Sequence, residues 1–70
     1  MVTLETFARL RKYMKKSYGK HKPSELRAFL HIDLGSIKET LEYMKNEGIV
    51  IEDDNGFWQY KRLKQVKLRN

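Results

Sequence analysis

The stretch from Leu30 to Val50 constrains the fold of this chain more than any other part. Its pattern is that of the end of one helix, a tight turn, a second helix and the start of a strand. Asp33 stands where the second helix needs a side chain that accepts hydrogen bonds from its first amides. Gly48 stands where a helix ends on a left-handed residue. The stretch therefore predicts a helix-turn-helix unit that continues into a β-strand.

The predicted helix after the turn, from about Leu34 to Glu47, has one apolar face. With about 100° between successive helical residues, Ile37, Leu41 and Met44 lie within about 40° of one direction. We expect that face to lie in the core. The opposite face is polar and would meet a partner. This face and its margins consist of Gly35, Ser36, Lys38, Glu39, Glu42, Tyr43 and Asn46.

Two further helices are predicted before the turn. Residues 3–18 have an amphipathic pattern, with Thr3 as the capping residue. The predicted apolar face of this helix consists of Leu4, Phe7, Leu10, Met14 and Tyr18. Ser24 is the predicted N-cap of a second helix, which runs to about His31. The predicted apolar face of the second helix consists of Leu26, Phe29 and Leu30.

The residues after Gly48 predict a β-hairpin that is rich in β-branched and aromatic side chains. The Asn55-Gly56 pair at its tip can adopt positive φ. Because Phe57 and Trp58 are adjacent, we expect one exposed ring or a β-bulge. The predicted segments are a strand at 49–51, a turn at 52–56, a return strand at 57–63 and a basic tail at 64–70.

Length and composition exclude several classes of protein. Seventy residues make one small domain, here 1–70 with its core at about 3–63. The chain has no cysteine, so it can form neither a disulfide nor a thiolate metal site. No apolar run approaches the roughly 20 residues of a membrane helix, and the N-terminus lacks a signal-peptide pattern. We expect a soluble cytoplasmic protein without membrane contact.

Catalysis and metal binding have no support in the sequence. His21 and His31 have no cysteine and no paired carboxylates at ligand spacing, so we expect no metal ion or other cofactor. Neither histidine has a serine or cysteine partner for nucleophilic catalysis, and we expect no enzyme activity. His21 lies in the basic loop 19–23, where an exposed side chain is expected.

The net charge of +6 is uneven, because both ends are basic and residues 25–54 are acidic. This distribution suggests a polyanionic partner such as nucleic acid, or else an ordinary solvated surface. The same two interpretations apply to the basic face of the first helix, which carries Arg9, Lys12 and Lys16.

The order of these elements resembles the winged helix-turn-helix superfamily of small bacterial and archaeal regulators, over about residues 3–63. The residues that carry the resemblance are Leu30-His31-Ile32 before Asp33, Gly48-Ile49-Val50 after the helix, and the strand from Gly56 to Leu63. The resemblance implies an α+β fold of three helices followed by a two-stranded β-hairpin wing. It further implies double-stranded DNA binding by a transcriptional regulator, with a homodimer that reads two half-sites.

Three places would contact DNA by this resemblance. The first half of the third helix would enter the major groove, the start of the second helix would bind a phosphate, and the wing would lie on the backbone or in a minor groove. Basic residues of the neighbouring loop and tail would add charge. The candidate residues are Lys20, Lys22, Ser24, Leu34, Ser36, Lys38, Glu39, Lys45, Asn55, Lys61, Arg62 and Lys64.

The acidic side chains favour a second hypothesis. Glu39 and Glu42 occupy the middle of the outer face of the third helix, and the hairpin tip adds residues 52–54, all acidic. Acidic groups near phosphates oppose binding, so the basic segments would have to supply the affinity. An adaptor or accessory subunit would instead use the acidic face to dock a basic protein. RNA is a variant of the first hypothesis, with Trp58 and Tyr60 stacking on bases, although we expect both rings to pack in the core.

Overall fold

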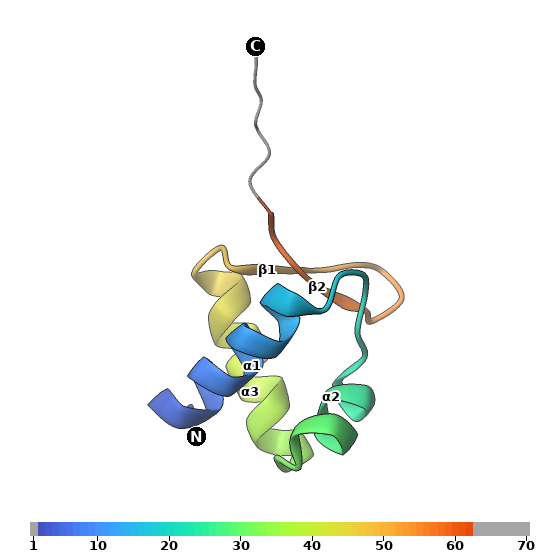
Figure 1. Cartoon of the computed structure of the whole chain (residues 1–70). Helices are drawn as coiled ribbons and strands as arrows, with labels where there is room; N and C mark the ends of the chain where they lie inside the picture. Colours follow the sequence, from blue (N-terminus) through green and yellow to red (C-terminus); the bar gives the residue numbers. More distant parts are fainter. Residues whose placement is uncertain (1, 63–70) are drawn as a thin grey trace.

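The computed structural model describes residues 2–62, which form three helices and a small antiparallel sheet (Figure 1). The α+β arrangement predicted from the sequence is confirmed. Residues 64–70, predicted to be a basic tail, lie outside the described residues. The elements are α1 (Leu4–Lys16), α2 (Pro23–Leu30), α3 (Leu34–Asn46), β1 (Val50–Glu52) and β2 (Trp58–Tyr60).

The start and end of α3 agree with the prediction. The Asp33 side chain accepts a hydrogen bond from the Ser36 amide at 3.0 Å, which satisfies one of the free donors at the start of the helix. Gly48 has a φ of 79°, and the amide of Ile49 donates to the carbonyl of Met44 at 2.8 Å. This left-handed residue reverses the chain so that β1 begins beside the end of α3.

The core lies where α1, α2 and the sheet pack around α3. The predicted inner face of α3, Ile37, Leu41 and Met44, is fully buried, which confirms the prediction. Thr40 on α3 is fully buried as well. The remaining buried apolar side chains are Leu10, Met14, Leu26, Ile32, Val50 and Trp58.

The first helix is shorter than predicted. It ends at Lys16, because Ser17 has an extended backbone, and Tyr18 leaves the helix with 76% of its surface exposed. Leu4 lies in the first turn and is 82% exposed. The prediction that both residues belong to the core face was therefore wrong, since only the middle of α1 meets α3.

The second helix begins two residues earlier than predicted. Lys22 is the N-cap and Pro23 is the first helical residue, a position that suits the fixed φ of proline. Ser24 therefore lies inside the helix, and its prediction as N-cap was wrong. His31 follows the last residue of α2 with a left-handed φ of 57°. Phe29, predicted to be apolar core, is 63% exposed.

The hairpin has an unbroken register, in which Val50 faces Tyr60 and Glu52 faces Trp58. Glu52 thus belongs to the strand and not to the turn, and β2 is shorter than the predicted return strand. Gly56 alone of the Asn-Gly pair has positive φ. No bulge occurs between β1 and β2; Trp58 is buried and the adjacent Phe57 is half-buried. Both Trp58 and Tyr60 pack against the core, as expected.

His21 differs most from its prediction, because its side chain is only 3% exposed. The backbone of His21 exchanges two 2.7 Å hydrogen bonds with Trp58, so the loop after α1 adds a one-residue bridge to the sheet. Its ring nitrogens lie 2.8 Å from a carboxylate oxygen of Glu25 and 3.0 Å from the carbonyl oxygen of Ser17. Gly19, with a φ of 101°, turns the chain into this position.

Candidate nucleic-acid interface

An open groove of about 530 Å³ runs between the start of α2, the first half of α3 and the tip of the hairpin. Trp58 and Gly56 contribute to its wall beside the acidic pair Glu42 and Glu52. Five candidate residues that are distant in sequence line this groove together. They are Lys22, Ser24, Leu34, Lys38 and Asn55.

The start of α2 differs from the starts of the other two helices. Thr3 caps α1 and Asp33 caps α3 through side-chain hydrogen bonds, whereas Lys22 gives α2 no such bond. Ser24, in the first turn of α2, lines the groove. The first amides of a helix need acceptors, and an anion in the groove would supply them.

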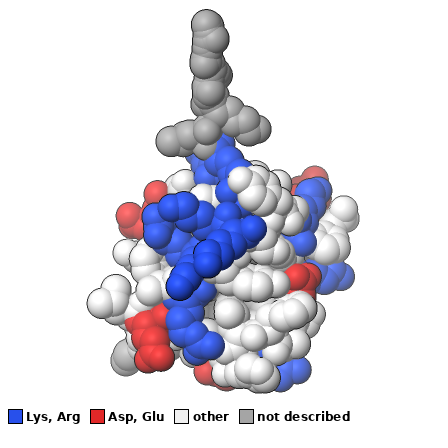
Figure 2. Space-filling view, in the orientation of Figure 1, with Lys and Arg blue, Asp and Glu red and all other residues white. Residues whose placement is uncertain are grey.

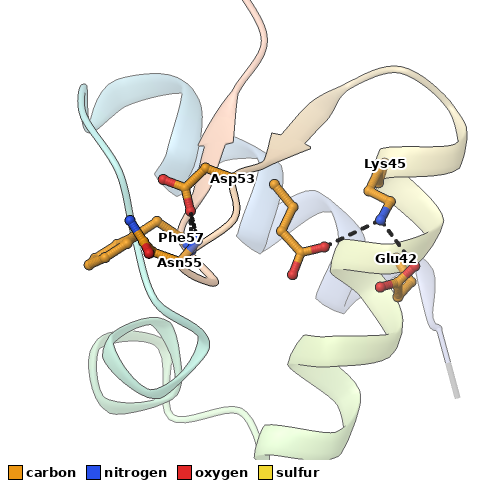
Figure 3. Close-up of polar contacts among 6 residues, drawn as sticks. Glu42, Lys45, Asp53, Asn55 and Phe57 are labelled. Carbon is orange, nitrogen blue, oxygen red and sulfur yellow. Dashed lines mark hydrogen bonds and ion pairs between the residues drawn. The ribbon is translucent and has the colours of Figure 1, made fainter.

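The acidic side chains of the groove are partly compensated within the fold. The ammonium group of Lys45 lies 3.3 Å from Glu52 on β1 and 4.0 Å from Glu42 on α3, where Figure 3 shows Lys45 above Glu42. The same ammonium group lies 5.7 Å from the centroid of the Trp58 ring. Lys45 thus connects α3 to the hairpin and leaves the three groups with one net negative charge. In the structure, Lys45 partly neutralises the carboxylates of Glu42 and Glu52. The sequence analysis assigned it only a contact with DNA.

The hairpin tip is held by Asp53 (Figure 3). Its carboxylate accepts from the amides of Asn55 at 2.9 Å and Phe57 at 3.0 Å, and from the ammonium group of Lys20 at 2.9 Å. These donors, Lys20 first, lower the pKa of Asp53. Lys20 therefore fixes the turn and does not line the groove.

Lys22 and Lys38 are the two cations that line the groove. Both are exposed, and neither forms an ion pair within residues 2–62. The ammonium group of Lys22 lies 5.0 Å from the centroid of the Phe57 ring, which holds the side chain beside the hairpin. The groove thus presents two accessible positive charges, one at the start of α2 and one on α3.

Other candidate residues lie away from the groove. The Ser36 hydroxyl donates to Asp33 at 2.9 Å and so belongs to the cap of α3. Glu39 is exposed on a neighbouring part of α3, beside Lys38. Lys61 is exposed just after β2. Lys64 lies outside the described residues.

Arg62 has a structural position. Its guanidinium donates to the carbonyls of Met14 at 3.3 Å and Lys15 at 3.1 Å, at the end of α1. The same group lies 3.7 Å from the centroid of the Tyr18 ring and 5.2 Å from that of Tyr60. Arg62 therefore caps α1 and connects it to β2, a contact between distant segments that no local sequence pattern indicates.

A basic surface lies on the other side of the domain. Figure 2 shows Lys and Arg side chains gathered over α1, which is in front of α3 in Figure 1 and behind it in Figure 3. Arg9 of α1 donates to the carbonyl of Leu30 at 2.7 Å and so belongs to the contact with α2. We call the remaining cations of this helix the α1 basic face; they are Arg11, Lys12, Lys15 and Lys16.

Within residues 2–62, no group of three or more His, Asp or Glu side chains is arranged to hold a metal ion. In that same part of the chain, no helix has both the length and the apolar character needed to cross a bilayer. Comparison of the chain with family models, curated proteins and solved structures gives no match.

Proposed function

We propose that this chain is a winged-helix protein that binds double-stranded DNA through the groove between α2, α3 and the hairpin. The observation that supports this proposal is the convergence of Lys22, Lys38 and Asn55 on one open surface. These residues come from three separate segments, and the resemblance assigned DNA contacts to each segment. A duplex on this surface would meet α3 in its major groove and the hairpin as a wing on its backbone.

The charges of this surface suit selective binding more than strong general binding. Lys22 and Lys38 would each neutralise a phosphate. The start of α2, which has no side-chain cap, would donate hydrogen bonds from its amides to a third phosphate. Lys45 reduces the repulsion from Glu42 and Glu52 without removing it. We therefore expect modest affinity with a shallow dependence on salt, since only a few counterions would be released.

Fluorescence anisotropy with labelled duplex DNA over a salt series tests this proposal. Lys38→Glu should weaken binding and lower the salt slope by about 1, because one phosphate contact is lost. Arg27→Glu is the matched control, since Arg27 is an exposed cation of α2 that does not line the groove. Equal effects of the two substitutions, or no duplex binding at about 50 mM salt, would contradict the proposal.

A role as a transcriptional regulator and a homodimeric state are part of the same proposal. A regulator of this kind reads two half-sites with two copies of the domain. Sedimentation of the protein with and without a palindromic duplex measures this directly. A single copy on every duplex tested would contradict the dimeric part of the proposal.

Docking of a basic protein partner is the second candidate function. Glu39 and Glu42 favour it, because both residues line one open depression on the exposed side of α3 and acidic groups suit a basic partner. Glu42→Gln distinguishes the two functions. Removing this charge should strengthen DNA binding in the first case, and should weaken capture of a basic partner in the second.

A further inference from the structure

The α1 basic face carries charge that the fold itself does not use. None of its four cations forms an ion pair within residues 2–62. Arg11 and Lys15, like Lys12 and Lys16, stand four residues apart, a spacing at which like charges destabilise a helix. A bound anion would relieve this repulsion.

Stabilisation of the helix end does not account for these cations. Basic residues in the last turn of a helix commonly offset the partial negative charge of its carbonyls. At the end of α1, however, Arg62 already donates to the carbonyls of Met14 and Lys15. Arg11 and Lys12 also lie before the last turn, where the helix dipole has little effect.

Tyr18 indicates what kind of anion would suit this surface. Its ring is 76% exposed and lines one open surface depression together with the α1 basic face and the side chains of Leu4, Phe7 and Ala8. Arg62 covers one side of the ring at 3.7 Å and is itself backed by Tyr60, so the aromatic side chain is held in place. An exposed, supported aromatic ring beside several cations is the combination that binds single-stranded nucleic acid.

The spacing of the cations agrees with this ligand. The pair Arg11 and Lys12 precedes the pair Lys15 and Lys16 by four residues, which is about 6 Å along a helix. The phosphates of one strand of a duplex advance about 3.4 Å along the helix axis, and neighbouring phosphates of a more extended single strand lie further apart. Each of the two pairs can therefore face one of two neighbouring phosphates of a single strand. A neighbouring unpaired base would then reach Tyr18.

We propose that the α1 basic face and Tyr18 form a second nucleic-acid site, which binds a single strand through its phosphates and one stacked base. This site lies on the opposite side of the domain from the groove (Figures 1 and 3). It does not depend on duplex binding in the groove. A protein with both sites would hold a duplex and a single strand at the same time.

Anisotropy with a labelled oligothymidylate tests the single-strand site. The double variant Lys12→Gln and Lys16→Gln should reduce the salt slope by about 1.4, the value for two contacts to a single strand. Tyr18→Ala should weaken binding at least about fivefold, whereas Tyr18→Phe should bind like the original chain, because stacking needs only the ring. Thermal unfolding of each variant confirms that the fold is retained.

Three controls separate this site from the groove and from general attraction. Lys38→Glu should affect oligothymidylate binding no more than Arg27→Glu does, and a saturating duplex should not displace the oligonucleotide. Arg27→Gln should have no more effect than any distant loss of charge. Equal binding by Tyr18→Ala and the original chain would overturn the proposal, as would loss of single-strand binding in Lys38→Glu alone.

Discussion

Replacement of the buried His21 by Asn should destabilise the domain by about 2 kcal/mol. The His21 ring has two polar partners, the Glu25 carboxylate at 2.8 Å and the Ser17 carbonyl at 3.0 Å. It also packs against Tyr13, with 5.5 Å between the ring centroids. Asn is too short to reach both partners, so at least one hydrogen bond is lost together with packing volume. Each such bond contributes about 1 kcal/mol, and a buried acceptor left without a donor adds to the cost.

Urea and thermal unfolding, followed by the fluorescence of Trp58, measure this effect. Trp58 is the only tryptophan of the chain and is 5% exposed, so its emission reports the loss of the core. A loss of about 2 kcal/mol lowers the melting temperature of a domain of this size by roughly 8–16 °C. The urea m-value should stay the same, because the surface exposed on unfolding does not change.

His31→Asn is the matched control for this experiment. His31 is exposed and has a φ of 57°, a conformation that Asn adopts readily. The same substitution should therefore change stability by less than about 0.5 kcal/mol at this position. If His21→Asn were equally mild, the two ring contacts of His21 would not contribute to the fold, and the reasoning would be refuted.

Two further predictions concern stability. Thr40→Val should stabilise the domain by about 1 kcal/mol, because within the described residues the buried Thr40 hydroxyl has no hydrogen-bond partner. A loss of stability in urea unfolding would show that the hydroxyl does have a partner. Donors from Ser36 lower the pKa of Asp33, and those from Lys20 and Phe57 lower the pKa of Asp53. Since both folded values lie below the unfolded value of 3.8, the unfolded chain binds protons first on acidification. The stability that these carboxylates contribute is complete well above pH 3.8 and is lost as the pH falls through the folded pKa values. In the double variant Asp33→Asn/Asp53→Asn, the urea midpoint should therefore fall less steeply with decreasing pH than in the original chain. An equally steep fall in both proteins would contradict the assignment of this stability to Asp33 and Asp53.

Local patterns were sufficient to predict three helices and the hairpin. Asp33 and Gly48 act through neighbours within a few residues, and the apolar spacing of α3 is long enough to identify one face. The patterns failed where a contact joins distant segments. His21 is buried because its backbone pairs with Trp58, and nothing in the basic loop around it indicates that partner.

Only part of the candidate site was predicted, again because contacts between distant segments leave no local pattern in the sequence. Lys22, Lys38 and Asn55 come together because the element order places their segments side by side. Lys45 and Arg62 were included for their charge, yet their ionic groups contact carboxylates and helix carbonyls of the fold itself. Tyr18 was assigned to the core from helical spacing, although the helix ends two residues before it.

The bridge between His21 and Trp58 has a consequence for how the chain folds. A short hairpin is at best marginally stable alone, and the three helices without it would lack Val50 and Trp58 from the common core. The bridge joins the first third of the described chain to β2, so neither part can complete its hydrogen bonds without the other. We expect a single cooperative unfolding transition, with exchange of the His21 and Trp58 amide hydrogens limited by global opening. In a nascent chain, the domain would reach its native state only after the residues of β2 had been synthesised.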